Sequence, residues 1–201
     1  DKRFLDSGIE LSPFLLPLRP GVASDPKRTF DGLFGVFNDS LPDGWGLLLL
    51  DRLLRRSGLP LERITPLSRL SLVGRGGMGA LEYEPVTPDP DPLPERIDLD
   101  GVAEEAWRTL NEDPLPVETL RTLMALNGSS CGARPKIMVR VSGDRRLIVP
   151  DAVAEPGCDP WLIKFPARHD DPAIGRMEYA CSLAAKRAGI EMPETALFPG
   201  R

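Results

Sequence analysis

The sequence predicts an α+β protein, and three patterns support that prediction. In "LLLLDRLLRRSG", leucines recur at helical spacing at positions 47, 50, 53 and 54. "KIMVRVSGDRRLIVP" alternates apolar and polar residues around Ser142-Gly143-Asp144, which is the pattern of a β-hairpin. Prolines at 85, 88, 90, 92 and 94 interrupt the chain between these segments and favour a stiff, extended connector. We therefore expect a small mixed N-terminal subdomain (1–84), a connector (85–100) and a β-rich second unit (101–201).

The expected elements of the first unit begin after a loop-like stretch, residues 1–30, which is rich in proline. The leucine-rich helix should end at Gly58. A second helix should start with Thr65 as its N-cap and Pro66 in its first position. The glycines of "GRGGMGALEYEP" are expected to bound a short strand, Ala80 to Tyr83.

The second unit should open with two helices, in 101–113 and 116–128. The hairpin follows, and "DPWLIKFPA" is expected to form a further strand. A helix in 172–190 should end near Gly189, and "EMPETALF" should begin another strand.

Composition limits the possible functions. The net charge of -5 over 201 residues argues against a general polyanion binder, because such surfaces are usually basic. No apolar run reaches the roughly 18 residues that a membrane helix needs. The sequence argues against a zinc site, because its three cysteines lack metal-type spacing and it has a single histidine, His169. The odd number of cysteines favours a reducing, cytoplasmic setting. We expect no membrane partner. The chain lacks an initiator methionine and stops within an expected β segment, so we expect a longer protein.

The segment "NGSSCGARPK" (127–136) places small residues between a helix and a strand. Small residues allow backbone N–H groups to approach phosphate oxygens and form an anion nest. A strand lysine, Lys164, and a helix glutamate, Glu178, follow in the order that a nucleotide site with an oriented lysine requires. The loop fits neither the GxxxxGK[ST] nor the GxGxxG pattern.

Simpler interpretations of these residues remain open. The loop could be a plain helix–strand connection, Lys164 a solvated edge-strand lysine, and Glu178 an exposed helix residue. Cys131 has no histidine nearby in sequence to activate it as a nucleophile. His169 fits a solvated loop residue, and Arg75 lies among glycines that a tight turn would explain.

Five stretches together resemble the HipA family, the toxin kinases of bacterial type II toxin–antitoxin systems. "LPDGWG" with its leucine helix and "GRGGMGALEYEP" are similar to the family's N-terminal subdomain. "NGSSCGARPK", "WLIKFP" and "MEYACSLAAKRAGIEMPE" are similar to the start of its kinase core. The resemblance implies a protein-kinase-like N-lobe over 101–201, with a C-terminal helical lobe that this chain lacks.

The resemblance also implies a serine/threonine protein kinase that uses ATP and Mg²⁺. Lys164 matches the ATP-binding lysine, and the implied ATP-binding loop consists of Cys131, Gly132, Ala133, Arg134, Pro135 and Lys136. Ser129 matches the position of autophosphorylation in relatives, and Ser130 is the neighbouring candidate. A phosphate there adds nearly two negative charges beside the ATP phosphates and would disable the kinase. The implied partners are an aminoacyl-tRNA synthetase as substrate, especially glutamyl-tRNA synthetase, and a HipB-like helix-turn-helix antitoxin that binds operator DNA.

The sequence departs from the family pattern at both ends. Strands before Phe4 and a helical lobe after Phe198 are missing, so the catalytic aspartate and the metal-binding asparagine and aspartate are not identified. Asp170 and Asp171 come too early and lack the motif. We expect that these residues alone do not transfer phosphate. The alternatives are a degenerate HipA-like scaffold for an antitoxin and DNA, a relative with nuclease chemistry, and an unrelated α+β domain.

Overall fold

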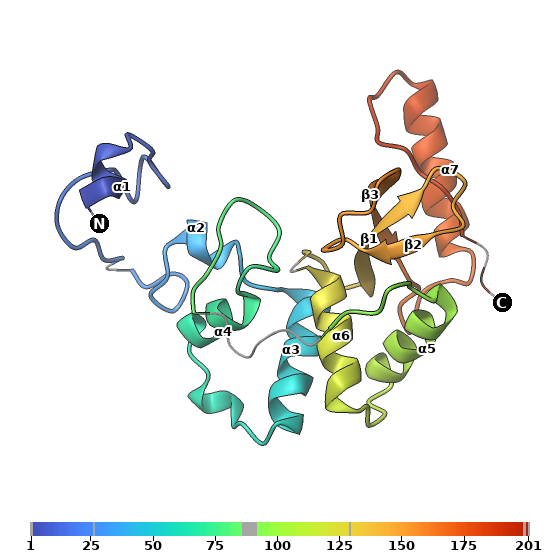
Figure 1. Cartoon of the computed structure of the whole chain (residues 1–201), viewed down its shortest axis with the longest axis horizontal. Helices are drawn as coiled ribbons and strands as arrows, with labels where there is room; N and C mark the ends of the chain where they lie inside the picture. The colour runs from blue at the N-terminus through green and yellow to red at the C-terminus, as the bar shows by residue number, and fades with distance from the viewer. Residues whose placement is uncertain (1, 26, 86–91, 129, 199, 201) are drawn as a thin grey trace.

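The computed structural model describes residues 2–25, 27–85, 92–128, 130–198 and 200. Seen along the chain in Figure 1, helices come first and a small sheet follows before the last helix. The α+β class is thus confirmed. The helices and strands are α1 (Lys2–Asp6), α2 (Gly35–Asn38), α3 (Gly44–Arg56), the 3₁₀ turn η1 (Leu61–Arg63), α4 (Pro66–Val73), α5 (Leu99–Leu110), α6 (Val117–Asn127), β1 (Lys136–Ser142), β2 (Ile148–Pro150), β3 (Cys158–Lys164) and α7 (Ile174–Arg187).

Several helix ends coincide with local signals in the sequence. Thr65 caps α4 by accepting a hydrogen bond from the Ser68 N–H at 3.1 Å, and Pro66 opens the helix, as predicted. Gly58 follows α3 with a φ of 74°, a conformation that favours glycine. Gly128 ends α6 in the left-handed region with a φ of 58°. Each of these signals is a conformational or hydrogen-bonding preference of a single residue, so it can be predicted from the sequence.

The sheet is antiparallel, with β1 between β2 and β3. Alternate residues of β1 (Ile137, Val139 and Val141) are buried, and α6 packs against this strand. On its other side α6 packs against α3, as Figure 1 shows. The three layers therefore run from α3 through α6 to the sheet.

One hydrophobic core joins these layers. It takes Trp45, Leu49 and Leu53 from α3, and its other members lie between Ile97 and Phe165. Trp45 and Leu49 are at most 1% exposed. Because the core combines side chains from α3 with side chains of residues 97–165, the position of α3 is tied to that of α6 and β1.

Two expected strands are wrong, and so is part of the loop-like beginning. Residues 80–83 form a loop in which the Tyr83 N–H donates to the Gly74 carbonyl, not to a neighbouring strand. Residues 191–198 are also irregular. An alternating pattern forms a strand only beside a partner, and the described residues provide none at either place. Within the expected loop 1–30, Lys2–Asp6 form the short helix α1.

Candidate functional site

The loop that follows α6, residues 130–136, is anchored at its start by a buried polar contact. Ser130 is 5% exposed, and its hydroxyl donates to the side-chain oxygen of Asn127 at 3.1 Å. The Ser130 N–H donates to the Asn127 carbonyl, also at 3.1 Å. Ser129, predicted as an autophosphorylation site, lies outside the described residues. In this conformation the Ser130 hydroxyl is thus enclosed by protein.

The middle of the loop contacts the first turn of α3. The Gly132 N–H donates to the Asp43 carboxylate at 2.6 Å, and the Trp45 N–H donates to the Gly132 carbonyl at 3.0 Å. A Cβ atom on Gly44 would lie 2.6 Å from the Gly132 carbonyl carbon, and one on Gly46 would lie 2.6 Å from the Asn127 amide nitrogen. The two glycines of "LPDGWG" therefore let α3 approach this part of the chain closely.

Lys136, the first residue of β1, turns its amine back into the loop. Only 5% of the residue is exposed, and its Nζ donates to the Cys131 carbonyl. Burial lowers the pKa of this amine; Asp43 opposes that shift and Lys164 adds to it. Lys164 is the register partner of Lys136 on β3, so two lysines face each other beside the loop.

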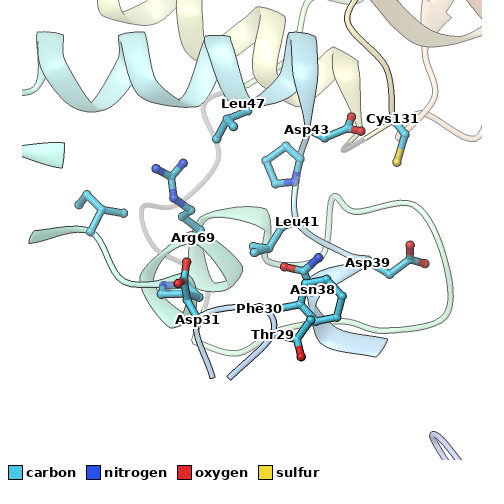
Figure 2. Close-up of a pocket in the computed structure, with 13 residues that line it drawn as sticks. Thr29, Phe30, Asp31, Asn38, Asp39, Leu41, Asp43, Leu47, Arg69 and Cys131 are labelled. Carbon is cyan, nitrogen blue, oxygen red and sulfur yellow. The ribbon is translucent and has the colours of Figure 1, made fainter. Parts of the chain in front are cut away.

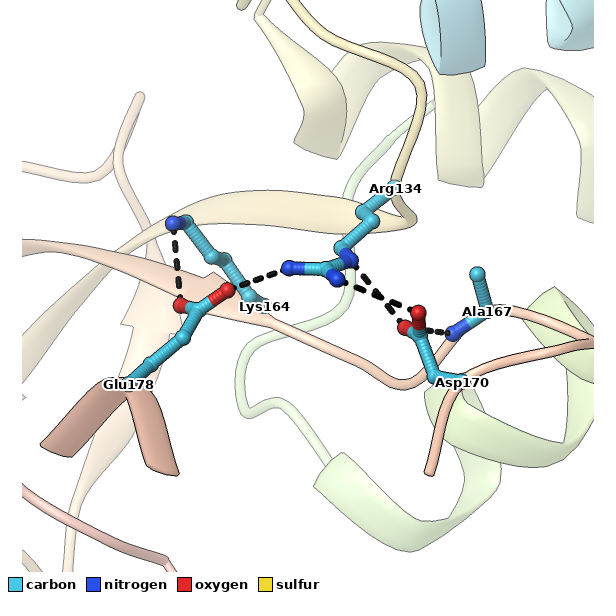
Figure 3. A network of polar contacts seen from close by, with 5 residues as sticks. All are labelled: Arg134, Lys164, Ala167, Asp170 and Glu178. Atoms are coloured by element: carbon cyan, nitrogen blue, oxygen red, sulfur yellow. Dashed lines mark hydrogen bonds and ion pairs between the residues drawn. The ribbon is translucent and has the colours of Figure 1, made fainter. Parts of the chain in front are cut away.

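Four charged side chains form a network next to the loop, drawn in Figure 3. The Glu178 carboxylate of α7 accepts from Lys164 Nζ at 3.1 Å and from Arg134 Nη1 through its other oxygen. Arg134 also holds Asp170, with Nε and Nη2 each 3.1 Å from a carboxylate oxygen. The Ala167 N–H donates to Asp170 and lowers the pKa of this carboxyl, and Arg134 lowers it further. Glu178 thus links the β3 lysine to the loop.

The loop also presents backbone N–H groups that have no acceptor among the described residues. In the part of the chain that the structure describes, no hydrogen bond leads from the N–H of Ala133 or of Arg134. The Pro135 carbonyl accepts from the Phe165 N–H at 2.8 Å, which ties the end of the loop to β3. Consecutive N–H groups beside two lysines form an arrangement that can hold an anion.

An open cavity of about 580 Å³ adjoins the loop. Figure 2 shows Asp43 and Cys131 near one another in its wall, with Asp31 and Arg69 elsewhere in the lining. Arg69 is paired with Asp51 at 3.0 Å, and Asp31, Asp39 and Asp43 contribute carboxylates. Its lining residues are Thr29, Phe30, Asp31, Asn38, Asp39, Leu41, Pro42, Asp43, Leu47, Ile64, Pro66, Arg69 and Cys131.

The structure brings most of the sequence-predicted residues together. Lys164, Glu178 and Arg134 form one network, and Lys136 reaches into the loop that contains Cys131. Lys164 lies on a strand at the edge of the described sheet and is nevertheless paired with Glu178. His169 is exposed, as expected for a loop residue.

Sequence reasoning missed two carboxylates at this site. Asp43 lies 89 positions before its partner Gly132, and Asp170 lies 36 positions after Arg134. Asp43 belongs to the motif "LPDGWG", but nothing in that motif indicates a contact with the 130–136 loop. For Asp170 no signal in the sequence pointed to Arg134.

Within the described ranges, no three His, Cys, Asp or Glu side chains are grouped so that they could hold a metal ion. The helices there are also too short or too polar to cross a bilayer.

Two family models match this chain. The HipA N-terminal domain matches residues 1–84, and the HipA-like C-terminal domain matches residues 128–201. No curated protein and no solved structure matches it. The first match contains Asp43 and α3, and the second contains the 130–136 loop, Lys164 and Glu178, so the contact between loop and helix joins the two matched regions. The chain belongs to the HipA family.

Proposed function

We propose that this protein acts as an ATP-dependent serine/threonine kinase of the HipA type, a toxin that an antitoxin restrains. The observation that carries the proposal is the Lys164–Glu178 ion pair beside a loop in which two N–H groups have no acceptor among the described residues. Protein kinases use a strand lysine, oriented by a helix glutamate, to hold the α- and β-phosphates of ATP. The small sheet with α7 would then correspond to the ATP-binding lobe of a kinase.

Each residue has a role in this proposal. Lys164 neutralises the α- and β-phosphates, and Glu178 fixes the direction of its amine. The N–H groups of Ala133 and Arg134 donate to phosphate oxygens, and Lys136 adds positive charge from within the loop. Arg134 itself is held by Glu178 and Asp170, so it acts mainly by fixing the loop.

The reaction would transfer the γ-phosphoryl group to a serine or threonine hydroxyl. The hydroxyl oxygen forms a bond to the γ-phosphorus, the bond to the β-phosphate oxygen breaks, and ADP leaves with that electron pair. The hydroxyl proton goes to a general base, a role that we assign to no residue of this chain. Mg²⁺ would screen the phosphate charges, and we assign it no ligand here either.

The proposed partners follow from family membership. We propose an aminoacyl-tRNA synthetase, such as glutamyl-tRNA synthetase, as the protein substrate, and a HipB-like antitoxin that contacts operator DNA. We further propose that Ser129 or Ser130 accepts a phosphate from the same site. Because the Ser130 hydroxyl is enclosed, its phosphorylation requires the loop to leave α6.

The test compares Lys164→Met with Lys186→Met, a matched change of an exposed lysine near the end of α7. Calorimetry should show Mg-ATP binding about tenfold or more weaker in Lys164→Met, because a hydrogen bond to a charged group contributes about 1.5–3 kcal/mol. Lys186→Met should bind like the wild type. Equal affinities in all three proteins would contradict the role of Lys164.

Transfer is tested in the longest natural form of the protein, with Mg-ATP and mass spectrometry of residues 129 and 130. A phosphate that appears in the wild type and is absent from Lys164→Met supports the kinase. Binding of ATP without phosphate on either serine or on the synthetase would favour the alternative, a HipA-like scaffold.

A further inference from the structure

Asp43 precedes α3 in the N-cap position, where an aspartate usually accepts a hydrogen bond from its own helix. It makes no such bond. Its carboxylate instead accepts from the Gly132 N–H at 2.6 Å, across 89 positions of the chain. A favourable local cap is thus absent, and the carboxylate contacts the 130–136 loop instead.

The same turn of α3 holds Gly132 by a second bond. The Trp45 N–H donates to the Gly132 carbonyl at 3.0 Å, so both polar backbone groups of Gly132 are bound to α3. Gly44 lies between Asp43, which accepts from Gly132, and Trp45, which donates to it, and a Cβ atom on Gly44 would be 2.7 Å from the Gly132 oxygen. The start of α3 therefore fits the loop backbone closely on one side.

The other side of the loop is held by the charged network. Arg134 is bound to Asp170 and Glu178, two positions after Gly132. Between these two attachments lie the N–H groups of Ala133 and Arg134, for which the described residues offer no acceptor. The attachment of Gly132 to Asp43 thus fixes the backbone from which these two groups project.

We propose that Asp43 is a positioning residue that holds the 130–136 loop in the form that receives a nucleotide phosphate. The proposal rests on the proposed function, because it assigns the N–H groups of Ala133 and Arg134 to the phosphate. Asp43 itself does not touch the nucleotide. It lies in the region matched by the N-terminal family model, so that region takes part in building the nucleotide site.

The effect of Asp43 on nucleotide affinity would be the opposite if its carboxylate mainly repelled the phosphates. Asp43 is negatively charged and close enough to Lys136 to raise the pKa of that amine. If repulsion between the carboxylate and the phosphates dominated, removing the charge would tighten nucleotide binding. The two possibilities predict opposite changes in affinity, which makes the experiment decisive.

The experiment compares Asp43→Ala, Asp43→Asn and Asp39→Ala in the 201-residue chain. The asparagine keeps an oxygen that can accept from the Gly132 N–H. Asp39 lines the same cavity and is exposed, so its removal controls for lost negative charge. Two readouts are recorded: the Gly132 amide signal by NMR without nucleotide, and Mg-ATP affinity by calorimetry. Thermal unfolding shows that each variant is folded at the assay temperature.

We expect Asp43→Ala to move the Gly132 amide proton upfield, to speed its exchange, and to weaken Mg-ATP binding about tenfold. Asp43→Asn should recover most of the affinity, and Asp39→Ala should match the wild type. A purely structural role would lower the unfolding temperature without this recovery or this change in affinity.

The outcomes separate the two proposals. No Mg-ATP binding by the wild type overturns the proposed function, and with it the proposal that Asp43 positions the loop for a nucleotide. Normal binding by the wild type, with equal or tighter binding by Asp43→Ala, overturns only the positioning role. An unchanged Gly132 signal in Asp43→Ala overturns the contact itself.

Discussion

Lys136 is a lysine that the fold nearly encloses, since 5% of it is exposed. Its amine donates to the Cys131 carbonyl, and Lys164 lies opposite it in the sheet. Keeping a positive charge there opposes folding unless an anion compensates it. A nucleotide phosphate would be such an anion.

This burial predicts a pH dependence of stability. Burial lowers the pKa of Lys136 below its usual 10.5 in the folded protein. Between the lowered folded pKa and about 10.5 the unfolded chain binds more protons, so this residue's contribution to stability rises with pH in that window. The difference in the free energy of unfolding between Lys136→Met and the wild type should therefore shift in favour of the wild type as pH increases toward 10.5.

Urea denaturation at several pH values from 7 to 10.5 measures this difference. Lys186→Met, which changes an exposed lysine, controls for the general loss of positive charge at high pH. A constant difference between Lys136→Met and the wild type across the range would contradict the lowered pKa.

At the scale of single residues, the sequence singles out those members of the charged network whose signals are local. The small residues of 127–136, the lysine on β3 and the glutamate on α7 stand out because they follow one another in the order expected of a nucleotide site. Asp43 and Asp170 were missed because each acts through a partner far along the chain. Such pairs depend on tertiary packing, which residue patterns do not encode by themselves.

At the scale of elements, α6 forms the middle layer and contacts the layers on both sides. It packs against α3 on one side and β1 on the other, and Leu120, Leu123 and Leu126 are each at most 2% exposed. Its C-terminal end carries Asn127, which holds Ser130 of the loop. The position of the loop therefore depends on the packing of this helix.

Leu123→Ala should lower the free energy of unfolding by about 2–5 kcal/mol, because it removes a buried side chain and leaves a cavity. Leu67→Ala on α4 is the matched control, since Leu67 is 68% exposed. The control should change stability by no more than about 0.5 kcal/mol. Chemical denaturation checks both values, and similar losses in the two variants would contradict the assigned core.

The elements that the sequence predicted well are those with local start and stop signals. Thr65, Pro66 and Gly128 mark helix ends through their own side chains or backbone preferences. The segments 80–83 and 191–198, expected as strands, have no neighbouring strand in the described part of the chain, and pairing cannot be judged from one segment alone. In the C-terminal segment, the Thr195 hydroxyl instead forms a hydrogen bond with that of Ser182 of α7, and the rings of Phe198 and Trp161 pack nearly perpendicular to each other.

On the scale of the whole molecule, the two regions matched by the family models are packed into one core. Trp45, Leu49 and Leu53 come from the first region, and Ile137 and Ile163 come from the second. The proline-rich run predicts a connector, but the sequence does not show which side chains pack across it. The shared core became visible only in three dimensions.

Because the core is shared, two separate polypeptides that together supply it should still associate. Residues 1–85 and 92–201, expressed together as two polypeptides, should purify as a one-to-one complex, because apolar burial between them does not need the connecting peptide. Leu49→Arg in the first polypeptide should prevent the complex, since Leu49 is 0% exposed. Size-exclusion chromatography with mass analysis is the measurement; independent elution of two folded fragments would refute the prediction.

The approach of Gly44 to Gly132 has a consequence for anyone who redesigns this protein. A new Cβ at position 44 would meet main-chain atoms of Gly132 and Ala133, at 2.6 to 2.8 Å. Most steric conflicts in proteins can be relieved by trimming the opposing side chain. Here the opposing atoms belong to the backbone, which every amino acid carries, so no second-site substitution can make room and only a displaced loop would restore the fit.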